Sequence, residues 1–394
     1  MDDWQTKKLG DICAFVRGPF GGSLKKNIFK NNGYAVYEQR HAIYNNFKDI
    51  RYYIDKSKFD EMKRFQIRSG DLIMSCSGTM GKVAIIPDEV QDGIINQALL
   101  ILSPKKGLFN KYLKMWMESD NFQQSLKKLS SGAAIKNVAS VQILKQIEIQ
   151  LPLFSEQKRI VRILDDVFEN IDKARENTEK NLQNSKDLFE AFLENAFSGK
   201  NWKVIPISER CQTGAGGTPL KSHKEYYEGG KIPWLRSGEV DKKEITKSEI
   251  FITEKGMKNS SARLFPSNTV LVAMYGATAG QVGILKFEST TNQAVCGILP
   301  NKYFVPEFVY YVLLSKKQEL VSQAVGGAQP NISQIKVKNT LLPDINIATQ
   351  NLIVKKLYVF SEQTKKLGRN YKQKLLLLDE LKKSVLQKAF SGNL

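Results

Sequence analysis

The heptapeptides LENAFSG (residues 193–199) and LQKAFSG (residues 386–392) end two stretches of this 394-residue chain that repeat each other. About 40 positions align without a gap at an offset of 193, so that Ile160 matches Ile353. A repeat of nearly 200 residues indicates a tandem duplication and not a short solenoid period. We therefore expect one domain followed by one long helix, each present twice.

The parts that precede the two helical stretches also match each other. SGTMGKVAI (77–85) corresponds to YGATAGQVGI (275–284), and the offset drifts elsewhere as loops gain and lose residues. Both copies contain short β-prone runs punctuated by Gly, Pro and Asn, and each has one helix-like run, at residues 109–129 and 306–325. This alternation predicts mixed α/β domains with a mostly antiparallel sheet.

The apolar residues of the helical stretches recur at alternating spacings of four and three, which is the heptad pattern of a coiled coil. A helix of ~40 residues is ~60 Å long and cannot bury such a stripe by itself. Gly199 and Gly392 suit a left-handed position at the helix ends. The residues predicted to pair the helices are Ile160, Leu164, Val167, Ile171, Ile353, Leu357, Phe360 and Leu367.

The order of the segments favours antiparallel pairing within the chain, with the domains at opposite ends and related by a pseudo-twofold axis. Residues 154–200 carry 8 basic and 10 acidic side chains, whereas residues 346–394 carry 10 and 3, so their charges are complementary. Packing of each helix on its own domain and dimerisation of two chains are the alternatives. The predicted fold class is α+β, with similar domains at residues 1–153 and 201–345 separated by two long antiparallel coiled-coil helices.

The charge balance points to a polyanionic partner. Lys and Arg number 59 against 40 Asp and Glu, a net charge of +19, and nucleic acid is the first candidate. A generally basic proteome is the alternative explanation. Four widely spaced cysteines without a C-x-x-C pair support neither a zinc site nor a disulfide framework. With no apolar run near 18 residues and no signal-like N-terminus, we expect a cytoplasmic protein without membrane contact.

Motifs for catalysis on DNA are missing from the sequence. It has no N-P-P-Y or D-P-P-Y loop, no G-x-G run for S-adenosylmethionine and no G-x-x-x-x-G-K-[ST] phosphate loop. His41 and His223 lie in separate copies, with no Ser or Cys nucleophile motif around either. We therefore expect a chain that is not catalytic by itself and holds no cofactor or metal.

Several motifs in a fixed order give the chain a resemblance to a known family. They include G-T-x-G-K-V-A-I (78–85), GGTP (216–219), LPLFSEQKRIV (151–161) and LLLLDELKKSVLQKAFSG (375–392). Over its full length the chain resembles the specificity subunit of type I restriction-modification systems. One departure is at residues 342–354, which have lost the charged E-Q-x-x-I form of the first copy.

This resemblance implies a function for each part of the chain. Each globular copy would be a target recognition domain that reads one half of a bipartite, asymmetric site in double-stranded DNA. The helices would set the spacing and bind two methyltransferase subunits, and motor-nuclease subunits would join in the restricting complex. S-adenosylmethionine, Mg and ATP are expected only in those partners. The alternatives are a specificity subunit of a fused nuclease-methyltransferase and a non-catalytic basic RNA-binding or architectural protein.

Divergence between the copies suggests which residues read DNA, because shared residues would form the scaffold. Aligning Tyr37 with Trp234 sets Gln39 opposite Arg236. Gln suits adenine and Arg suits guanine in the major groove. Tyr37 and Trp234 themselves are expected in the core. The same alignment sets Arg40 opposite Ser237.

A second group of candidate DNA contacts lies in loops. Some precede the repeated Gly81 and Gly280, where a plain tight turn before a strand is an equal alternative, and the others are polar loop residues suited to phosphate contacts. These candidates are Ser75, Ser77, Thr79, Tyr275 and Thr278, followed by Lys25, Lys26, Lys136, Asn137, Lys221, Gln329 and Asn331.

Overall fold

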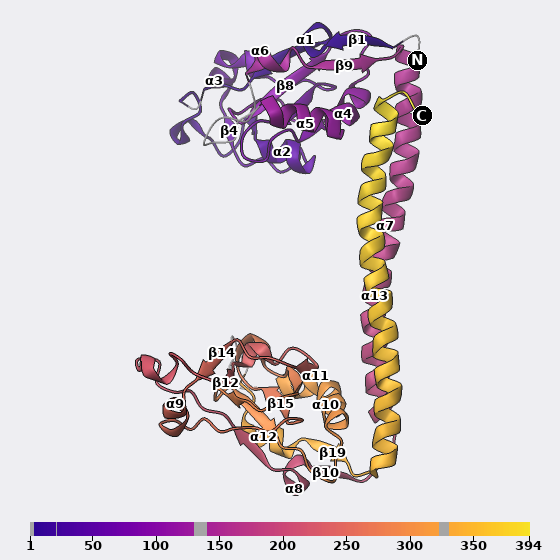
Figure 1. Ribbon diagram of the computed structural model, residues 1–394. Coiled ribbons are helices and arrows are strands. Elements are labelled where there is room, and N and C mark those ends of the chain that lie inside the picture. The colour runs from indigo at the N-terminus through magenta and orange to yellow at the C-terminus, as the bar shows by residue number, and fades with distance from the viewer. Residues whose placement is uncertain (1–3, 21, 130–139, 323–330) are drawn as a thin grey trace. The chain divides into compact units, whose positions relative to one another are not determined.

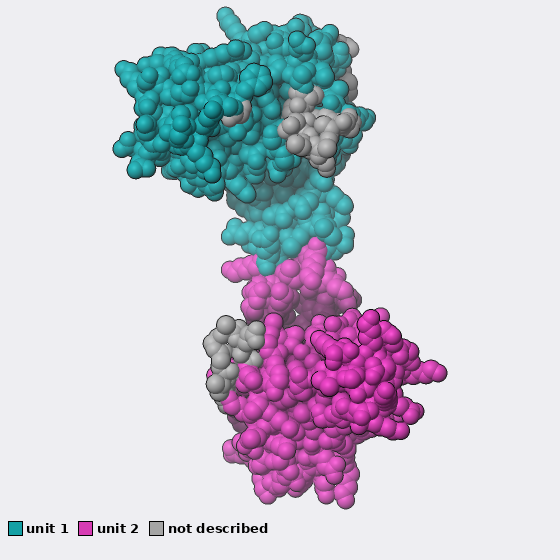
Figure 2. Space-filling model, turned by 90° about the vertical axis from the view of Figure 1, so that its left-hand side faces the viewer, with its two compact units in different colours: residues 1–179, 373–394 teal, residues 180–372 magenta. Residues whose placement is uncertain are grey.

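The computed structural model divides into two compact units, unit 1 (residues 1–179 and 373–394) and unit 2 (residues 180–372) (Figure 2). Both long helices are shared between the units, so each unit holds one globular domain and one end of each helix. The predicted division at residues 153, 200 and 345 stays a prediction. The structure describes residues 4–20, 22–129, 140–322 and 331–394.

Unit 1 is a mixed α/β domain (Figure 1). Its strands are β1 (Gln5–Lys8), β2 (Cys13–Arg17), β3 (Tyr34–Tyr37), β4 (Tyr53–Ile54), β5 (Leu72–Ser75), β6 (Val83–Ile85), β7 (Gly93–Ile95), β8 (Leu99–Pro104) and β9 (Glu148–Leu151). Its short helices are α1 (Leu9–Ile12), η1 (Lys26–Ile28), α2 (Gln39–Tyr44), α3 (Lys56–Glu61), η2 (Lys63–Phe65), α4 (Asn110–Glu118), α5 (Asp120–Leu129) and α6 (Val141–Leu144).

Unit 2 repeats this plan with one strand more. Its strands are β10 (Val204–Pro206), β11 (Thr213–Ala215), β12 (Ile232–Leu235), β13 (Glu244–Ile245), β14 (Ile250–Ile252), β15 (Val270–Ala273), β16 (Val282–Leu285), β17 (Thr290–Thr291), β18 (Val295–Ile298) and β19 (Leu341–Pro343). Its short helices are α8 (Ile207–Arg210), η3 (Lys224–Tyr226), η4 (Ser237–Glu239), α9 (Glu254–Lys258), η5 (Gly276–Thr278), α10 (Pro306–Ser315), α11 (Lys317–Ser322) and α12 (Gln334–Asn339).

The sheets of the two units correspond strand by strand. The order β2-β8-β5-β6 in unit 1 matches β11-β18-β15-β16 in unit 2, and β4-β3-β7 matches β14-β12-β17. Pairing is antiparallel except between β3 and β7, between β12 and β17, and between β13 and β16. The predicted mostly antiparallel sheet is therefore confirmed. Strand β13 is the addition in unit 2, where it extends the sheet beyond β16.

Each helix-like run of the sequence forms two helices instead of one. Ser119 separates α4 from α5 because its backbone is extended (φ −68°, ψ 152°), and its buried hydroxyl donates to the carbonyl oxygen of Trp116 at 2.6 Å. Lys316 separates α10 from α11, although its backbone is not extended (φ −94°, ψ 7°) and its N–H still donates to the carbonyl of Val312. The helix-like runs predicted at 109–129 and 306–325 are therefore helical in their described residues, and each contains a break that hydrophobic periodicity does not register.

The long helices α7 (Phe154–Phe197) and α13 (Ile347–Phe390) each contain 44 residues. Gly199 (φ 65°) and Gly392 (φ 74°) follow their ends in the left-handed conformation, as the sequence predicts. The two helices begin and end at positions related by the same offset of 193, so both copies of the repeat have one design.

In unit 1 the two helices run antiparallel. Asp172 and Lys382 approach to 3.7 Å, and Arg175, three residues later, pairs with Asp379, three residues earlier. In unit 2, the rings of Phe192 and Phe360 stack with centroids 4.0 Å apart. These contacts confirm the predicted antiparallel helix pair.

Each domain core is completed by the end of the other repeat's helix. In unit 1, Phe390 at the end of α13 lies edge-on to Tyr112 of α4, with ring centroids 5.2 Å apart. In unit 2, Phe197 at the end of α7 meets Phe308 of α10 in the same way at 5.8 Å. Ile160, at the start of α7, is buried in the same cluster as Phe390. Packing of each helix on a domain and pairing of the helices therefore occur together.

A buried glutamine near the start of each long helix fastens that helix to its domain. Gln157 accepts from the backbone N–H of Phe109 at 2.8 Å and donates to the carbonyls of Gly107 and Pro152. Gln350 accepts from Val305 N–H at 2.9 Å and donates to the carbonyls of Tyr303 and Ile345. The second copy has lost the Glu of E-Q-x-x-I but keeps the Gln and its three bonds.

Most residues predicted to pair the helices are buried or partly buried. Leu164 and Leu357 are fully buried, and Ile171 lies buried among the paired helices. Leu367 is the exception, since it is 41% exposed. The pairing side of α13 at this level is occupied by Thr364 and by Gly368, which faces Ser185 of α7. The predicted pairing role of Leu367 is therefore wrong.

Candidate nucleic-acid interface

In unit 2 the strand register gathers four loops at one edge of the sheets. Strands β11 and β15 both end opposite the first residues of β18, and β12 ends beside β17, which leads into β18. The loops that follow these strand ends therefore lie together. We call them the loop edge of unit 2, which comprises residues 216–219, 236–239, 274–280 and 292–294.

Unit 1 has the same loop edge. Strands β2 and β5 end opposite the start of β8, and β3 ends beside β7, which leads into β8. The loop edge of unit 1 comprises residues 18–20, 38–40, 76–81 and 96–98. Several DNA-contact candidates, drawn from distant parts of the sequence, fall within these two edges.

Close backbone contacts fix the first loop of each edge. A Cβ atom on Gly18 would lie 1.9 Å from the carbonyl oxygen of Asn96, and one on Gly216 would lie 2.1 Å from that of Thr291. Only glycine allows this approach. In unit 2, the hydroxyl of Thr218 also donates to the side chain of Gln293. The repeated Asn-Gln pair and the glycine before the loop are therefore parts of the scaffold.

The structure corrects the alignment of the two edges by one residue. Asn96 N–H donates to the carbonyl of Tyr37, and Asn292 N–H donates to the carbonyl of Leu235, both at 2.9 Å. Tyr37 therefore corresponds to Leu235, and not to Trp234 as the sequence alignment predicted. Both Tyr37 and Trp234 are buried core residues, as expected.

The corrected register sets Glu38 opposite Arg236. Both residues precede a helical turn, and in both the backbone N–H donates at 2.9 Å to a side chain three residues later, His41 in unit 1 and Glu239 in unit 2. The hydrogen bond from the backbone N–H is therefore the same in both units, whereas the side chains differ. Glu38 is replaced by Arg236, and His41 is replaced by Glu239. Gln39, predicted to stand opposite Arg236, stands opposite Ser237.

The side chains at this turn are available to different extents. Arg236 has a half-exposed guanidinium that donates to Glu249 at 2.8 Å. Gln39 and Arg40 are partly buried, and Arg40 pairs with Asp49. The Oε2 atom of Glu38 and the Oε1 atom of Gln39 are buried without a hydrogen-bond partner in the described part of the chain. This turn therefore holds two unsatisfied acceptors within partly buried side chains, a feature that calls for an explanation in a folded protein.

A cavity of about 370 Å³ opens beside Arg236. Its lining includes Lys221 and Lys224, together with the rings of Tyr227 and Trp234. Trp234 is held by its indole N–H, which donates to the carbonyl of Gly217 at 2.9 Å. The structure thus joins two predicted residues, Lys221 and Arg236, and adds Lys224. Sequence analysis missed Lys224 because no period or motif distinguishes it from other loop lysines.

Tyr275 and Asn331 are joined although 56 positions separate them in the sequence. Their backbones form an isolated antiparallel bridge, and Ile332 N–H donates to the carbonyl of Met274 at 2.8 Å. Tyr275 is exposed, and Thr278 of η5 is partly buried. This part of the loop edge therefore presents an aromatic ring and an amide side by side.

Ser75 has a structural role and not the predicted DNA contact. Its side chain is fully buried, its hydroxyl donates to the carbonyl of Thr79 at 2.6 Å, and it accepts from Lys82 N–H at 3.0 Å. Ser75 therefore closes the turn that precedes β6. Thr79 is exposed within this turn, and Ser77 is partly buried.

The remaining candidates are not assembled into the loop edges by any contact described. Lys25 and Lys26 are exposed at the 3-10 helix η1, outside the loop edge of unit 1. Lys136, Asn137 and Gln329 lie outside the described residues.

The cysteine thiols are withdrawn from solvent. All four cysteines are buried, and burial raises the pKa of the Cys13, Cys76 and Cys296 thiols to about 12 and that of Cys211 to about 11. These thiols are protonated at neutral pH, so they are poor nucleophiles. Within the described ranges, no group of three or more His, Cys, Asp or Glu side chains is placed to hold a metal ion.

The long helices are amphipathic and not apolar throughout. Across the part of the chain that the structure describes, none of the helices combines the length and hydropathy needed to cross a membrane.

The chain is thus a duplicated fold with matched loop edges, and the sequence match defines its family. The sequence model of the type I restriction modification DNA specificity domain matches residues 1–182 and 199–376. The chain belongs to this family of type I restriction-modification DNA specificity proteins.

Relatives support this assignment over different lengths. The putative type I restriction enzyme MjaX specificity subunit of Methanocaldococcus jannaschii is 24% identical over 416 residues, which cover 100% of this chain and 94% of that protein. The EcoR124I/EcoR124II specificity subunit of Escherichia coli is 28% identical over 217 residues, 53% of this chain. The matched region spans about half the length of the E. coli relative (52%).

Solved structures share the fold. The HsdS subunit of Thermoanaerobacter tengcongensis has a TM-score of 0.67 at 18% identity, covering 100% of this chain and 97% of that one. A chain from a structure of type I R-M system assembly and conformational transition has a TM-score of 0.77 at 18% identity, with 100% and 99% covered. The fold class predicted from the sequence, two similar mixed α/β domains with two long helices, is therefore confirmed.

Proposed function

We propose that this chain is the DNA-recognition subunit of a type I restriction-modification complex. Each domain reads one half of a bipartite, asymmetric site in double-stranded DNA. The long helices set the spacing of the domains and bind two methyltransferase subunits, and motor-nuclease subunits join them in the restricting complex. S-adenosylmethionine, Mg and ATP act in those partners, and this chain supplies recognition only.

The observation that carries the proposal is the pair of loop edges. They share strand ends, glycine contacts and the turn that begins at Glu38 or Arg236, yet they display different side chains. A carboxylate at such a turn accepts from cytosine N4, whereas a guanidinium donates to guanine O6 and N7. Two loop edges with the same backbone structure but different side chains suit a DNA site whose two halves differ. The net charge of +19 supplies the attraction for phosphates that sequence-independent DNA affinity needs.

The test is co-purification of the chain with its cognate methyltransferase subunit, followed by sequencing of methylated adenines in the host DNA. We expect a stable complex and a split, asymmetric methylation motif that disappears when this chain is deleted. A complex without any dependent motif, or a chain that binds DNA without sequence preference, would contradict the proposal.

A further inference from the structure

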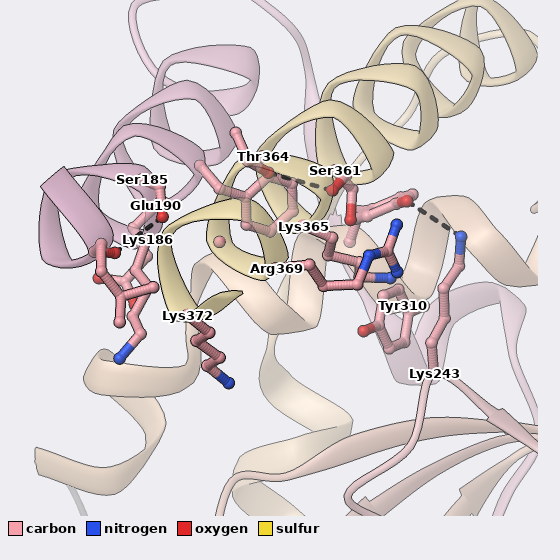
Figure 3. A pocket seen from close by; sticks show the side chains of 14 residues that line it. Ser185, Lys186, Glu190, Lys243, Tyr310, Ser361, Thr364, Lys365, Arg369 and Lys372 are labelled. Carbon is pink, nitrogen blue, oxygen red and sulfur yellow. Dashed lines mark hydrogen bonds between the residues drawn. The ribbon is translucent and has the colours of Figure 1, made fainter. Parts of the chain in front are cut away.

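A cavity of about 500 Å³ lies in unit 2 where the two long helices meet the domain (Figure 3). Phe189 of α7 and the rings of Tyr310 and Tyr311 of α10 form apolar parts of its lining. We call this cavity the junction cleft. It lies on another part of the unit from the loop edge, since none of its lining residues belongs to the edge loops.

The junction cleft exists because the α13 side chains at this level are small. Ser361, Thr364 and Gly368 line it. Their counterparts in unit 1, 193 positions earlier, are Phe168, Ile171 and Arg175. In unit 1 these larger side chains make contacts of their own, because the ammonium of Lys382 lies 4.8 Å from the ring centroid of Phe168 and Arg175 pairs with Asp379.

The lining of the junction cleft is strongly basic. Glu190 is the one carboxylate among its lining residues, against five cations from three segments, namely Lys186, Lys243, Lys365, Arg369 and Lys372. The unit 1 counterparts of the three α13 cations are Asp172, Glu176 and Glu179. The two helix ends therefore have the same backbone design and opposite charge.

Much of this positive charge is uncompensated. Among the described residues, no carboxylate lies within 4.0 Å of the charged nitrogens of Lys186, Arg369 or Lys372. Lys243 precedes β13, a strand with no counterpart among the described residues of unit 1, and donates to the hydroxyl of Tyr311 at 3.1 Å. Burial, and then repulsion from Lys365, lower the pKa of Lys243. Glu244, Glu307 and Glu362 act on Lys243 in the opposite sense, and Lys365 itself pairs with Glu362 at 2.9 Å. The cations of the cleft that an anionic partner would compensate are therefore Lys186, Arg369 and Lys372 first of all.

The spacing of the cations shows what kind of anion fits. Lys365, Arg369 and Lys372 recur at i, i+4 and i+7, so they share one face of α13 and extend over ~10 Å of its axis. A single phosphate could not contact all three. An amphipathic helix with carboxylates at the same spacing could contact all three cations. Its apolar residues could pack on the aromatic side chains that line the cleft, as in helix-in-groove recognition.

We propose that the junction cleft of unit 2 docks an acidic, amphipathic helical segment of the methyltransferase subunit, and that the corresponding surface of unit 1 does not. This inference rests on the proposed function, since it takes the methyltransferase as the partner. It makes the two ends of the helix pair unequal binding sites, with the unit 2 end dependent on salt and the unit 1 end much less so.

The test uses the full chain with three charges reversed, Lys365→Glu, Arg369→Glu and Lys372→Glu. Its matched control reverses three exposed α13 lysines outside the cleft, Lys355→Glu, Lys356→Glu and Lys366→Glu, which gives the same net charge. Binding of the cognate methyltransferase subunit is titrated calorimetrically at about 50 and about 300 mM salt, where screening differs strongly.

We expect two binding steps for the wild-type chain, only one of them strongly weakened by salt. In the cleft variant the affinity of that step should fall by roughly tenfold or more, while in the control variant it should stay within about twofold of the wild-type value. Equal losses in both variants, or an unaffected cleft variant, would overturn the proposal. Loss of DNA binding with intact methyltransferase binding would also overturn it, because the cleft would then be a DNA contact. If the wild-type chain binds no methyltransferase, the proposed function itself fails.

A cross-link identifies the segment that docks. Lys372→Cys carries a benzophenone maleimide, which labels this exposed position because the native cysteines are buried. We expect the cross-linked methyltransferase peptide to be rich in Asp and Glu at helical spacing. A basic or neutral peptide, or no cross-link in a complex that still forms, would contradict the assignment.

Discussion

Units 1 and 2 are the same domain built twice, and two of their differences bear on what each unit binds. Both use a buried glutamine to fasten the start of one long helix, a phenylalanine at the end of the other long helix to complete the core, and a glycine that fixes the first edge loop. They differ at the turn that begins with Glu38 or Arg236 and at the junction of domain and helices. Residues that hold the fold are therefore kept, and those that face a ligand are free to change.

The largest expected effect is the removal of Phe390, the end of α13 in the core of unit 1. Phe390→Ala should destabilise unit 1 by ~3–5 kcal/mol because it leaves a cavity against Tyr112. The matched change Phe197→Ala in unit 2 should cost less, since Phe197 is only partly buried. Hydrogen exchange measured by mass spectrometry resolves the units. Equal loss of protection in both units after either change would refute the local account.

Removal of the buried glutamines should have similar effects in the two units. Gln157→Leu and Gln350→Leu each leave one backbone donor and two carbonyls without their partner, and we expect ~2–3 kcal/mol of destabilisation for each. Urea unfolding of the full chain and of both variants measures this. A large cost in unit 1 with none in unit 2 would contradict the equivalence of the two glutamines.

Arg236→Ala should weaken DNA binding by about 1–3 kcal/mol at one half-site only. The corrected register makes Glu38→Ala the matched change for the other half-site, and it should relax a preference there by a similar amount. Competition binding with duplexes altered in either half separates the two effects. A uniform loss over all sequences would make either residue a contact to the phosphate backbone.

The smallest expected effect is that of Leu367→Ala, which should change the free energy of unfolding by less than about 0.5 kcal/mol because the side chain is exposed. Urea unfolding under the same conditions gives the value. A cost of several kcal/mol would show that Leu367 does pair the helices, as the heptad pattern predicts.

The features that the sequence predicts correctly are those that follow from hydrophobic periodicity and from the internal repeat. The heptads and the glycines of AFSG predicted the lengths of α7 and α13 and their pairing, because burial of a long apolar stripe has few solutions. The register of the loop edges was off by one, because a hydrogen bond from Asn96 or Asn292 decides it and no periodicity reports that bond. The sequence did not predict strand β13, because that strand has only two residues. It did not predict the junction cleft, because the cleft forms where small side chains of α13 leave space between packed elements.

We propose that the two loop edges, which share one backbone structure, read two different half-sites. Sequencing of methylated adenines in cells that carry the wild-type chain, Arg236→Ala or Glu38→Ala tests it most directly. We expect a split motif in which Arg236→Ala relaxes one half and Glu38→Ala relaxes the other. If both changes leave the motif intact, or if both alter the same half, the two loop edges do not read separate half-sites.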